Sequence, residues 1–290
     1  MLYPRKSHPF FINPQEKGLI LRRHMEATAT NQLEALRVVL CQTDPFWQQA
    51  EKNRVALTSQ IEAVGPTADV VVLPEMFTTG FSMAPTQLAE PMTGPTMQWM
   101  QALANQYNTV LAGSLIIVEE GFFYNRFVWV APHASPAYYD KRHGFTLAGE
   151  HLKYKAGEND GLVTYRGWKI CLRICYDLRF PVWCRNTQDY DLLLFVGNWP
   201  LPRMQAWDAL LKARAIENMS YCCGVNIVGQ DPKGNQYRGH SAAYDALGNC
   251  LTEPLVETAT ALKVTLDFQA QQALRKQFRF LADRDSFELH

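Results

Sequence analysis

From about residue 37 onward, short apolar runs alternate with segments whose apolar residues recur at helical spacing. Runs such as 37–42 and 191–199 are rich in Val, Leu and Phe, which predicts strands that are buried on both faces. Strands that alternate with helices, with no linker or repeat between them, predict a single α/β domain whose sheet is covered by helices. The predicted strands are 37–42, 69–75, 109–117, 122–130, 137–141, 168–177, 191–199, 221–229, 241–245 and 261–268, and the predicted helices are 46–63, 93–108, 204–219 and 268–279.

Residues 1–34 show no sustained periodicity, so we expect a loose N-terminal extension ahead of one domain that spans 35–290. Met25 is a candidate natural start, in which case the residues before it are not native. N-terminal sequencing of the natively expressed protein tests this hypothesis, and a mature chain that begins upstream of Met25 contradicts it.

The composition narrows the class of ligand and the compartment. Apolar residues make up 47% of the 290 residues, and 28 basic side chains balance 28 acidic ones. This balance disfavours nucleic acid and anionic membranes as partners and favours a small molecule. No apolar run approaches the roughly 20 residues of a spanning helix, and no secretion signal is evident, so we expect a cytoplasmic protein.

The seven cysteines contain no C-x-x-C pair, which argues against a structural zinc site or a redox motif. Nucleotide-binding and phosphate-binding glycine motifs are absent as well, so we expect neither a metal nor a cofactor. A cytoplasmic chain of this size keeps its thiols reduced, and most of them are expected to be small buried hydrophobic groups.

Candidate chemical groups stand just after the predicted strands, where sites form in α/β folds. Glu75, Lys141, Cys175 and Asn198 occupy such positions. A cysteine nucleophile needs a base, because only a few per cent of a free thiol is ionised at pH 7. None of the seven histidines is singled out by spacing, whereas Glu75 follows an apolar strand and Pro74 and is suited to act as a partly desolvated base. On these grounds alone, Cys175 is either a nucleophile or one more buried thiol.

Three of these strand-end segments resemble one family together. The strings LPEMFTTGF, YDKRHGF and ICYDLRFP are similar to the Glu, Lys and Cys signatures of the nitrilase superfamily, the carbon–nitrogen hydrolases. GEHLKYKAG resembles the segment that carries that family's second glutamate, here Glu150. The longer strings around them look most like the omega-amidase branch, and the resemblance runs through about 36–285 in order.

The resemblance implies a four-layer α-β-β-α sandwich and a Glu75–Lys141–Cys175 triad that works through a Cys thioester. Glu75 is then the base, and Lys141 and the backbone N–H of Tyr176 hold the oxyanion. Glu150 is expected to orient Lys141 or the substrate. The family also implies a homodimer.

The omega-amidase resemblance implies a substrate with a free carboxylate and a 2-oxo group, namely 2-oxoglutaramate or 2-oxosuccinamate. Arg203 is a candidate to bind that carboxylate through its planar fork, and Phe145 and Trp199 are candidates to wall the acyl chain, although both equally suit core packing. Arg179 is expected to be structural and to pair with an acid near Cys175.

Two alternatives remain open at this point. Another substrate of the superfamily fits the same triad, such as deaminated glutathione, an N-carbamoyl amino acid or a nitrile. A catalytically dead fold that serves as a binding module is disfavoured, because all three triad residue types are present. Gly144 departs from the larger apolar residue of the family pattern, which predicts a more mobile loop near Lys141.

Overall fold

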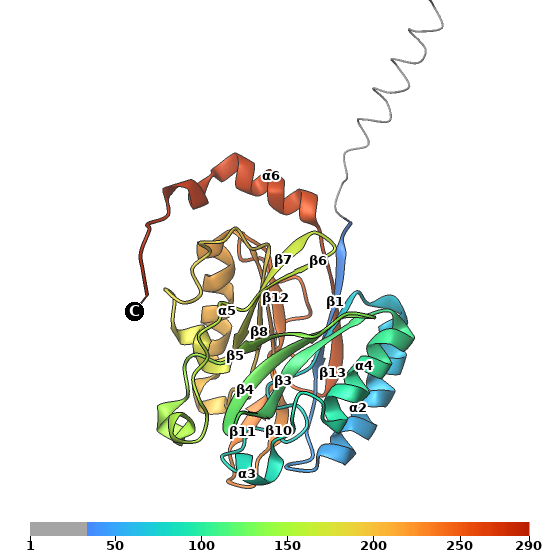
Figure 1. Cartoon of the computed structure of the whole chain (residues 1–290). Helices are drawn as coiled ribbons and strands as arrows, with labels where there is room; N and C mark the ends of the chain where they lie inside the picture. Colours follow the sequence, from blue (N-terminus) through green and yellow to red (C-terminus); the bar gives the residue numbers. More distant parts are fainter. Residues whose placement is uncertain (1–33, 290) are drawn as a thin grey trace, which may run out of the picture. The chain divides into compact units, whose positions relative to one another are not determined.

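Two β-sheets pack face to face and carry helices on their outer faces (Figure 1). The computed structural model describes residues 34–289, which cluster as one compact unit. The expectations for the N-terminal extension and for Met25 lie outside the described residues, apart from Glu34.

The first sheet has the strand order β13-β1-β2-β3-β4-β5. Its three strands β1, β2 and β3 run parallel, and the remaining pairs are antiparallel. The bounds are β1 Leu36–Gln42, β2 Val70–Val72, β3 Val110–Glu119, β4 Phe122–Val130, β5 Ala137–Asp140 and β13 Thr260–Leu266.

The second sheet has the order β12-β9-β8-β7-β6, with β7, β8 and β9 parallel. A separate hairpin pairs β10 with β11. The bounds are β6 Leu162–Tyr165, β7 Trp168–Ile174, β8 Leu192–Val196, β9 Tyr221–Val225, β10 Val228–Gln230, β11 Gln236–Arg238 and β12 Ala242–Tyr244.

Helices α2 and α4 lie side by side against the first sheet, and α5 covers the second sheet on the opposite side of the molecule (Figure 1). The α-helices are α2 Ala50–Val64, α3 Pro85–Leu88, α4 Pro95–Tyr107, α5 Met204–Asn218 and α6 Phe268–Phe278. Short 3-10 helices are η1 Gly65–Thr67, η2 Thr146–Ala148, η3 Glu150–Leu152, η4 Cys175–Arg179, η5 Leu201–Arg203 and η6 Phe280–Asp283. No helix among residues 34–289 is long and apolar enough to cross a membrane.

The pleat of each central strand explains why its sequence is apolar throughout. In β1, Val38 and Leu40 join the core between the two sheets, whereas Val39 and Cys41 face the helices outside. In β8, Leu194 lies between the sheets and Phe195 packs beneath α5. Successive side chains point to opposite faces, and here both faces are covered, so the α-β-β-α sandwich is confirmed.

The sequence prediction missed some elements and merged others. The strand predicted at 221–229 is two strands, β9 and β10, which belong to different sheets. The strand predicted at 69–75 ends at Val72, and Leu73 and Pro74 lead out of the sheet toward Glu75. The elements β6, β11 and α3 were not predicted, since each has only three or four residues and gives no measurable period.

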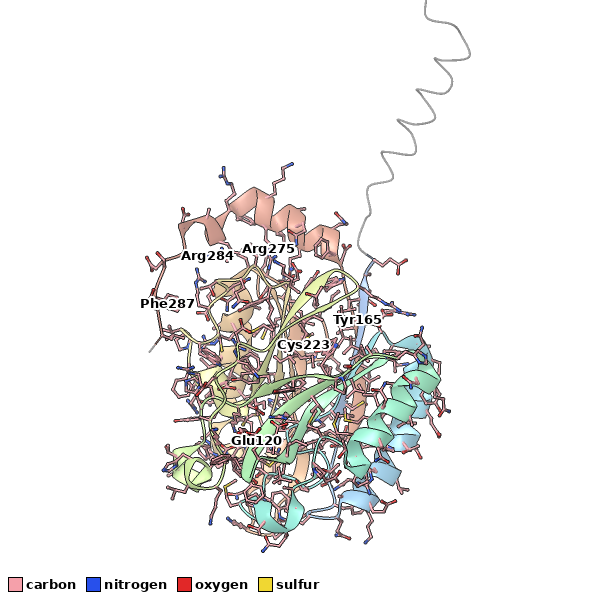
Figure 2. All side chains as sticks on the ribbon, in the orientation of Figure 1. Glu120, Tyr165, Cys223, Arg275, Arg284 and Phe287 are labelled. Atoms are coloured by element: carbon pink, nitrogen blue, oxygen red, sulfur yellow. The ribbon has the colours of Figure 1, made fainter. Side chains whose placement is uncertain are left out.

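Two arginines attach the C-terminal segment to the second sheet (Figure 2). Arg275 of α6 lies 2.8 Å from Asp191, measured between Nη1 and Oδ1. Arg284 lies 2.7 Å from Asp189, between the same two atom types. Helix α6 and the segment after it are therefore held to the loop that leads into β8, and none of these four residues lines the cavity described next.

Candidate active site

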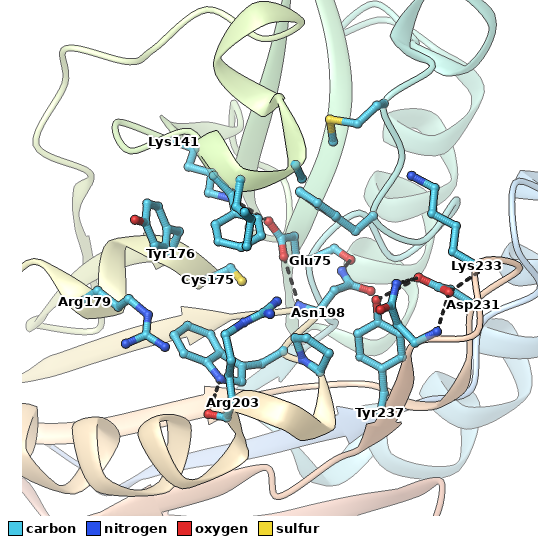
Figure 3. Close-up of a pocket in the computed structure, with 18 of the residues that line it drawn as sticks. Glu75, Lys141, Cys175, Tyr176, Arg179, Asn198, Arg203, Asp231, Lys233 and Tyr237 are labelled. Atoms are coloured by element: carbon cyan, nitrogen blue, oxygen red, sulfur yellow. Dashed lines mark hydrogen bonds and ion pairs between the residues drawn. The ribbon is translucent and has the colours of Figure 1, made fainter.

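The candidate groups meet where strands of both sheets end (Figure 3). Glu75 follows β2, Lys141 follows β5 directly, and Cys175 follows β7 directly. Asn198 lies two residues beyond β8. Because the two sheets are packed face to face, residues that are far apart in the sequence line one cavity of about 220 Å³.

Cys175 stands at a sharp change of backbone direction. It follows the last residue of β7 and begins η4, and its φ of 43° lies in the left-handed region, which a residue with a side chain rarely adopts. Asp177 holds this turn, because its Oδ2 accepts the Ile174 N–H at 3.0 Å and the Tyr139 hydroxyl at 2.8 Å. The turn projects the half-buried thiol into the cavity, toward Glu75 (Figure 3).

Lys141 forms the centre of a buried charge cluster. Its Nζ donates to Glu75 Oε1 at 2.9 Å, to Glu150 Oε1 at 3.0 Å and to Glu150 Oε2 at 2.9 Å. All three side chains are at most 2% exposed. A buried ammonium between two carboxylates is held in one place by its hydrogen bonds, and the cluster carries a net negative charge when all three groups are ionised.

Two asparagines support the cluster. The Asn125 side chain donates to Glu75 Oε1 at 2.8 Å and to Glu150 Oε1 at 3.1 Å. The Asn198 backbone N–H donates to Glu75 Oε2 at 2.9 Å, and its side chain donates to the Glu75 carbonyl oxygen at 2.6 Å. Asn198 was expected from its position after a predicted strand, whereas Asn125 was not predicted. One indication of Asn125 was present in the sequence, namely an amide side chain inside the mostly apolar strand predicted at 122–130.

The charges of the cluster shift the pKa values of its members. Burial raises the pKa of the Cys175 thiol well above its usual range; the Glu75 carboxylate adds to this and Lys141 opposes it. Burial alone would lower the pKa of Lys141, but Glu150 and Glu75 outweigh it and the pKa is raised. The resting site therefore holds a protonated thiol and a charged ammonium at neutral pH, so the thiol needs a base to become a nucleophile.

The pKa of Glu150 is also raised, chiefly by burial and further by the Glu75 carboxylate, with Lys141 opposing both. The Phe145 N–H donates to Glu150 Oε2 at 2.6 Å, which ties the loop after Lys141 to this carboxylate. Glu150 thus contacts Lys141 rather than the open part of the cavity.

The cavity wall beyond the cluster has an aromatic part and a cationic part. Phe145 and Trp199 both line it, as predicted candidates for the wall. The guanidinium of Arg203 lies 5.1 Å from the centre of the Phe145 ring, and that of Arg179 lies 5.0 Å from the Trp199 ring. Trp199 is also part of the core beneath α5, so it serves packing and the wall together.

The expectation that Arg179 pairs with an acid is wrong. Among residues 34–289 no carboxylate lies within ion-pair distance of Arg179 or Arg203. The nearby acid, Asp177, is instead 2.8 Å from His143 Nδ1 and bonds the Tyr139 hydroxyl. Both arginines are consequently available to a ligand in the cavity.

Gly144 allows a close approach between two parts of the loop that carries Glu150. A Cβ at this position would lie 3.1 Å from the backbone N of His151. A larger residue would therefore require the segments around Gly144 and His151 to separate slightly. The greater mobility expected of this loop stays a prediction.

Comparison with known proteins agrees with this geometry. The family model described as carbon-nitrogen hydrolase matches residues 37–276. The chain is 42% identical to Omega-amidase YafV of Escherichia coli (strain K12) over 259 residues, which cover 89% of this chain and 100% of that protein. It is 35% identical to 2-oxoglutaramate amidase of Bacillus subtilis (strain 168) over 222 residues, 74% of this chain and 85% of that one.

A solved structure gives the same result for the fold. XC1258 from Xanthomonas campestris, described as a CN-hydrolase superfamily protein with an arsenic adduct in the active site, superposes with a TM-score of 0.86. It is 39% identical, and the match covers 89% of this chain and 100% of that one.

Proposed function

The chain belongs to the carbon-nitrogen hydrolase family, and from that membership we propose that it is an omega-amidase. Its proposed reaction converts the terminal amide of a 2-oxo dicarboxylic acid monoamide, such as 2-oxoglutaramate, into the acid and ammonia. The observation that carries this proposal is the meeting of Glu75, Lys141 and Cys175 at one cavity whose arginines have no carboxylate partner among the described residues.

In the first half of the proposed reaction, Glu75 takes the proton of the Cys175 thiol as the sulfur attacks the amide carbon. The proton moves between two groups of the same buried cluster, so the net charge of the cluster does not change. The carbonyl oxygen becomes an oxyanion, which the Lys141 ammonium and the backbone N–H of Tyr176 stabilise. One such preorganised donor contributes about 3–4 kcal/mol to lowering the barrier. The C–N bond then breaks, Glu75 returns the proton to the nitrogen, and ammonia leaves.

In the second half, the acyl group remains on Cys175 as a thioester. Glu75, again ionised, removes a proton from water as the water oxygen attacks the thioester carbon. The C–S bond breaks, the proton returns to the sulfur, and the acid product leaves. One water is consumed and one ammonia released, with Glu75 as the base in both halves.

The substrate class follows from charge complementarity. Arg203 and Arg179 each offer a planar set of N–H donors that fits a carboxylate. We propose that Arg203 binds the substrate carboxylate, as its sequence position suggested, and that Arg179 belongs to the same subsite rather than to the scaffold. Phe145 and Trp199 pack against these guanidiniums and wall the acyl chain.

The proposed function is tested by ammonia release from the purified protein. 2-Oxoglutaramate is compared with glutamine, an N-carbamoyl amino acid, deaminated glutathione and a simple nitrile. We expect 2-oxoglutaramate to be the best substrate. A faster reaction with one of the others keeps the family but changes the substrate, and release from none of them indicates a different acyl group. A binding module is tested separately with a thiol alkylator, since it should show no cysteine that reacts far faster than a free thiol.

Replacing the cavity arginines should separate binding from chemistry. We expect Arg203→Ala and Arg179→Ala each to lower kcat/KM for 2-oxoglutaramate about 10- to 100-fold, mostly through KM, because each removes a charged hydrogen bond to the carboxylate. Steady-state kinetics with 2-oxoglutaramate and with an uncharged amide measure the effect.

Arg238→Ala is the matched control, since Arg238 pairs with Glu257 at an exposed position outside the cavity. An equal loss with charged and uncharged amides in the cavity variants would contradict the carboxylate subsite.

Glu75→Gln should stop the reaction before the thioester forms. The amide cannot accept the thiol proton, and the raised pKa of Cys175 keeps the sulfur protonated at neutral pH. We expect a loss of at least about 10³-fold in kcat. Intact-protein mass spectrometry after mixing with 2-oxoglutaramate should show unmodified protein, and an accumulated acyl-enzyme would instead place the role of Glu75 in deacylation.

We also propose a homodimer. Exposed apolar side chains gather beside α5, where Ile216 contacts the turn at Gly248 and Leu247 lies in the same turn. Sedimentation equilibrium of the wild-type protein tests the state of association, and a monomer at micromolar concentration contradicts it.

A cytoplasmic location is proposed because the seven cysteines are all free within residues 34–289, and a nucleophilic thiol works in a reducing compartment. Fractionation of native cells against compartment markers tests this proposal.

A further inference from the structure

Asn125 is buried in β4, and its side-chain amide donates hydrogen bonds to two carboxylates of the candidate active site. Like Lys141 Nζ, its Nδ2 contacts both carboxylates, Glu75 Oε1 at 2.8 Å and Glu150 Oε1 at 3.1 Å. An amide nitrogen has two hydrogens, and here each points to a different carboxylate. Asn125 therefore stabilises both groups in the ionised form.

The orientation of this amide is set by a second residue. The Ser114 hydroxyl donates to Asn125 Oδ1 at 2.8 Å, while Ser114 Oγ accepts the Met76 backbone N–H at 2.9 Å. The backbone donor occupies the hydroxyl oxygen as an acceptor, so the hydroxyl hydrogen is directed at Asn125. A flipped amide would place its NH₂ against a donor and its oxygen against two carboxylates, which is strongly unfavourable.

The two oxygens of Glu75 consequently differ. Oε1 accepts from both Asn125 and Lys141, which occupies its two lone pairs. Oε2 accepts only one hydrogen bond among the described residues, from the Asn198 N–H. In Figure 3 the Cys175 sulfur points toward the side of Glu75 on which Oε2 accepts the Asn198 N–H, so Oε2 is the carboxylate oxygen that faces the thiol.

We propose that Asn125, oriented by Ser114, is a positioning residue that directs the Cys175 proton to Oε2 of Glu75. This inference rests on the proposed function, in which Glu75 is the base. The S–H bond breaks and an O–H bond forms at the oxygen with a free lone pair, while Oε1 stays bound to its two donors. The base thereby keeps its orientation during both halves of the reaction.

A pH profile of kcat/KM tests the proposal, because the base must be ionised to act. A hydrogen bond to a carboxylate lowers its pKa, so removing that bond raises the pKa and moves the acid limb of the profile to higher pH. We expect Asn125→Ala to shift the acid limb upward by roughly one pH unit and to lower kcat about 10- to 100-fold. Ser114→Ala leaves the amide in place without its orienting donor, and it should shift the limb in the same direction by less.

Asn125→Asp extends the series, since a third carboxylate beside Glu75 and Glu150 should move the acid limb further upward than Asn125→Ala does. The expected order of acid limbs is wild type, Ser114→Ala, Asn125→Ala and then Asn125→Asp. Asn186→Ala is the matched control. Asn186 is equally buried and donates to Tyr190 and Asn218 carbonyls outside the cavity, so its loss should lower the melting temperature and leave the pH profile unchanged.

Different results would contradict the proposed function and the proposed role of Asn125. A wild-type protein without amidase activity contradicts the proposed function. An active wild type whose acid limb stays in place in Asn125→Ala and Asn125→Asp contradicts the role of Asn125, whatever the change in kcat. A drop in activity that is equal at every pH, accompanied by a lower melting temperature as in Asn186→Ala, assigns Asn125 a structural role only.

Discussion

Cys175→Ala is expected to abolish ammonia release from 2-oxoglutaramate, with a fall of at least about 10⁴-fold in kcat. The sulfur is the atom that attacks the amide carbon, and among residues 34–289 Cys175 is the only cysteine that lines the cavity. The fold should be retained, because the side chain is half-buried at the cavity edge and alanine differs by one sulfur atom. Ammonia assays and thermal unfolding of the same preparation measure the two effects.

Cys222→Ala serves as the matched control for this substitution. Cys222 lies in β9 beneath α5, fully buried and away from the cavity, so its replacement should lower stability by about 1 kcal/mol or more and leave kcat unchanged. Substantial turnover by Cys175→Ala would refute the assignment of the nucleophile.

Lys141→Met is expected to remove activity and to destabilise the protein together. The ammonium is the counter-charge of two fully buried carboxylates, and taking one partner from a buried ion pair costs about 3–5 kcal/mol. Activity should fall at least about 10³-fold, because the proposed oxyanion loses its charged partner. Urea unfolding and ammonia release measure the two effects.

The stability loss in Lys141→Met should depend on pH. Without the ammonium, Glu75 and Glu150 repel each other, so the folded protein holds a proton on the pair that the unfolded chain releases. A group whose pKa is raised in the folded state contributes stability at low pH and loses that contribution as the pH rises. The difference in unfolding free energy from the wild type should therefore grow between about pH 5 and pH 8.

Glu150→Gln is the matched variant for this prediction. It removes one of the two carboxylates and leaves Lys141 paired with Glu75, so it should cost far less stability than Lys141→Met. The raised pKa of Glu150 means that its ionisation opposes folding at neutral pH, which the substitution relieves. Equal destabilisation by both variants would contradict the description of Lys141 as the counter-charge of the cluster.

The apolar periodicity predicted most long elements because their packing is simple. The strands β1, β3, β4, β7 and β8 and the helices α4 and α5 each bury a continuous face, so the pattern appears in the residue types. Short elements such as β6, β11 and α3 were not predicted, because three or four residues show no period. The division of 221–229 into β9 and β10 was also not predicted, because the apolar pattern does not change where the chain passes from one sheet to another.

The candidate site was partly visible before the fold was known. Glu75, Lys141 and Cys175 stand in motifs that resemble one family, and their positions after strands suggested a common edge. The prediction that Arg179 pairs with an acid near Cys175 was wrong. Asp177 lies only two residues from Arg179 in the sequence, but its carboxylate contacts His143 and Tyr139 instead. Asn125 and Ser114 were not predicted, because a single polar residue in an apolar strand has no distinctive spacing.

The amino-acid sequence by itself determined the α/β class, the buried strands and the residue types of the proposed chemistry, because these depend on local periodicity and on short motifs. Only the tertiary structure decided which oxygens Lys141 and Asn125 contact, which arginines remain without a carboxylate partner among the described residues, and that burial raises the pKa of Cys175. The contacts of Glu75 join it to groups that are 50 or more residues away in the chain and that the packing of two sheets brings within hydrogen-bond distance.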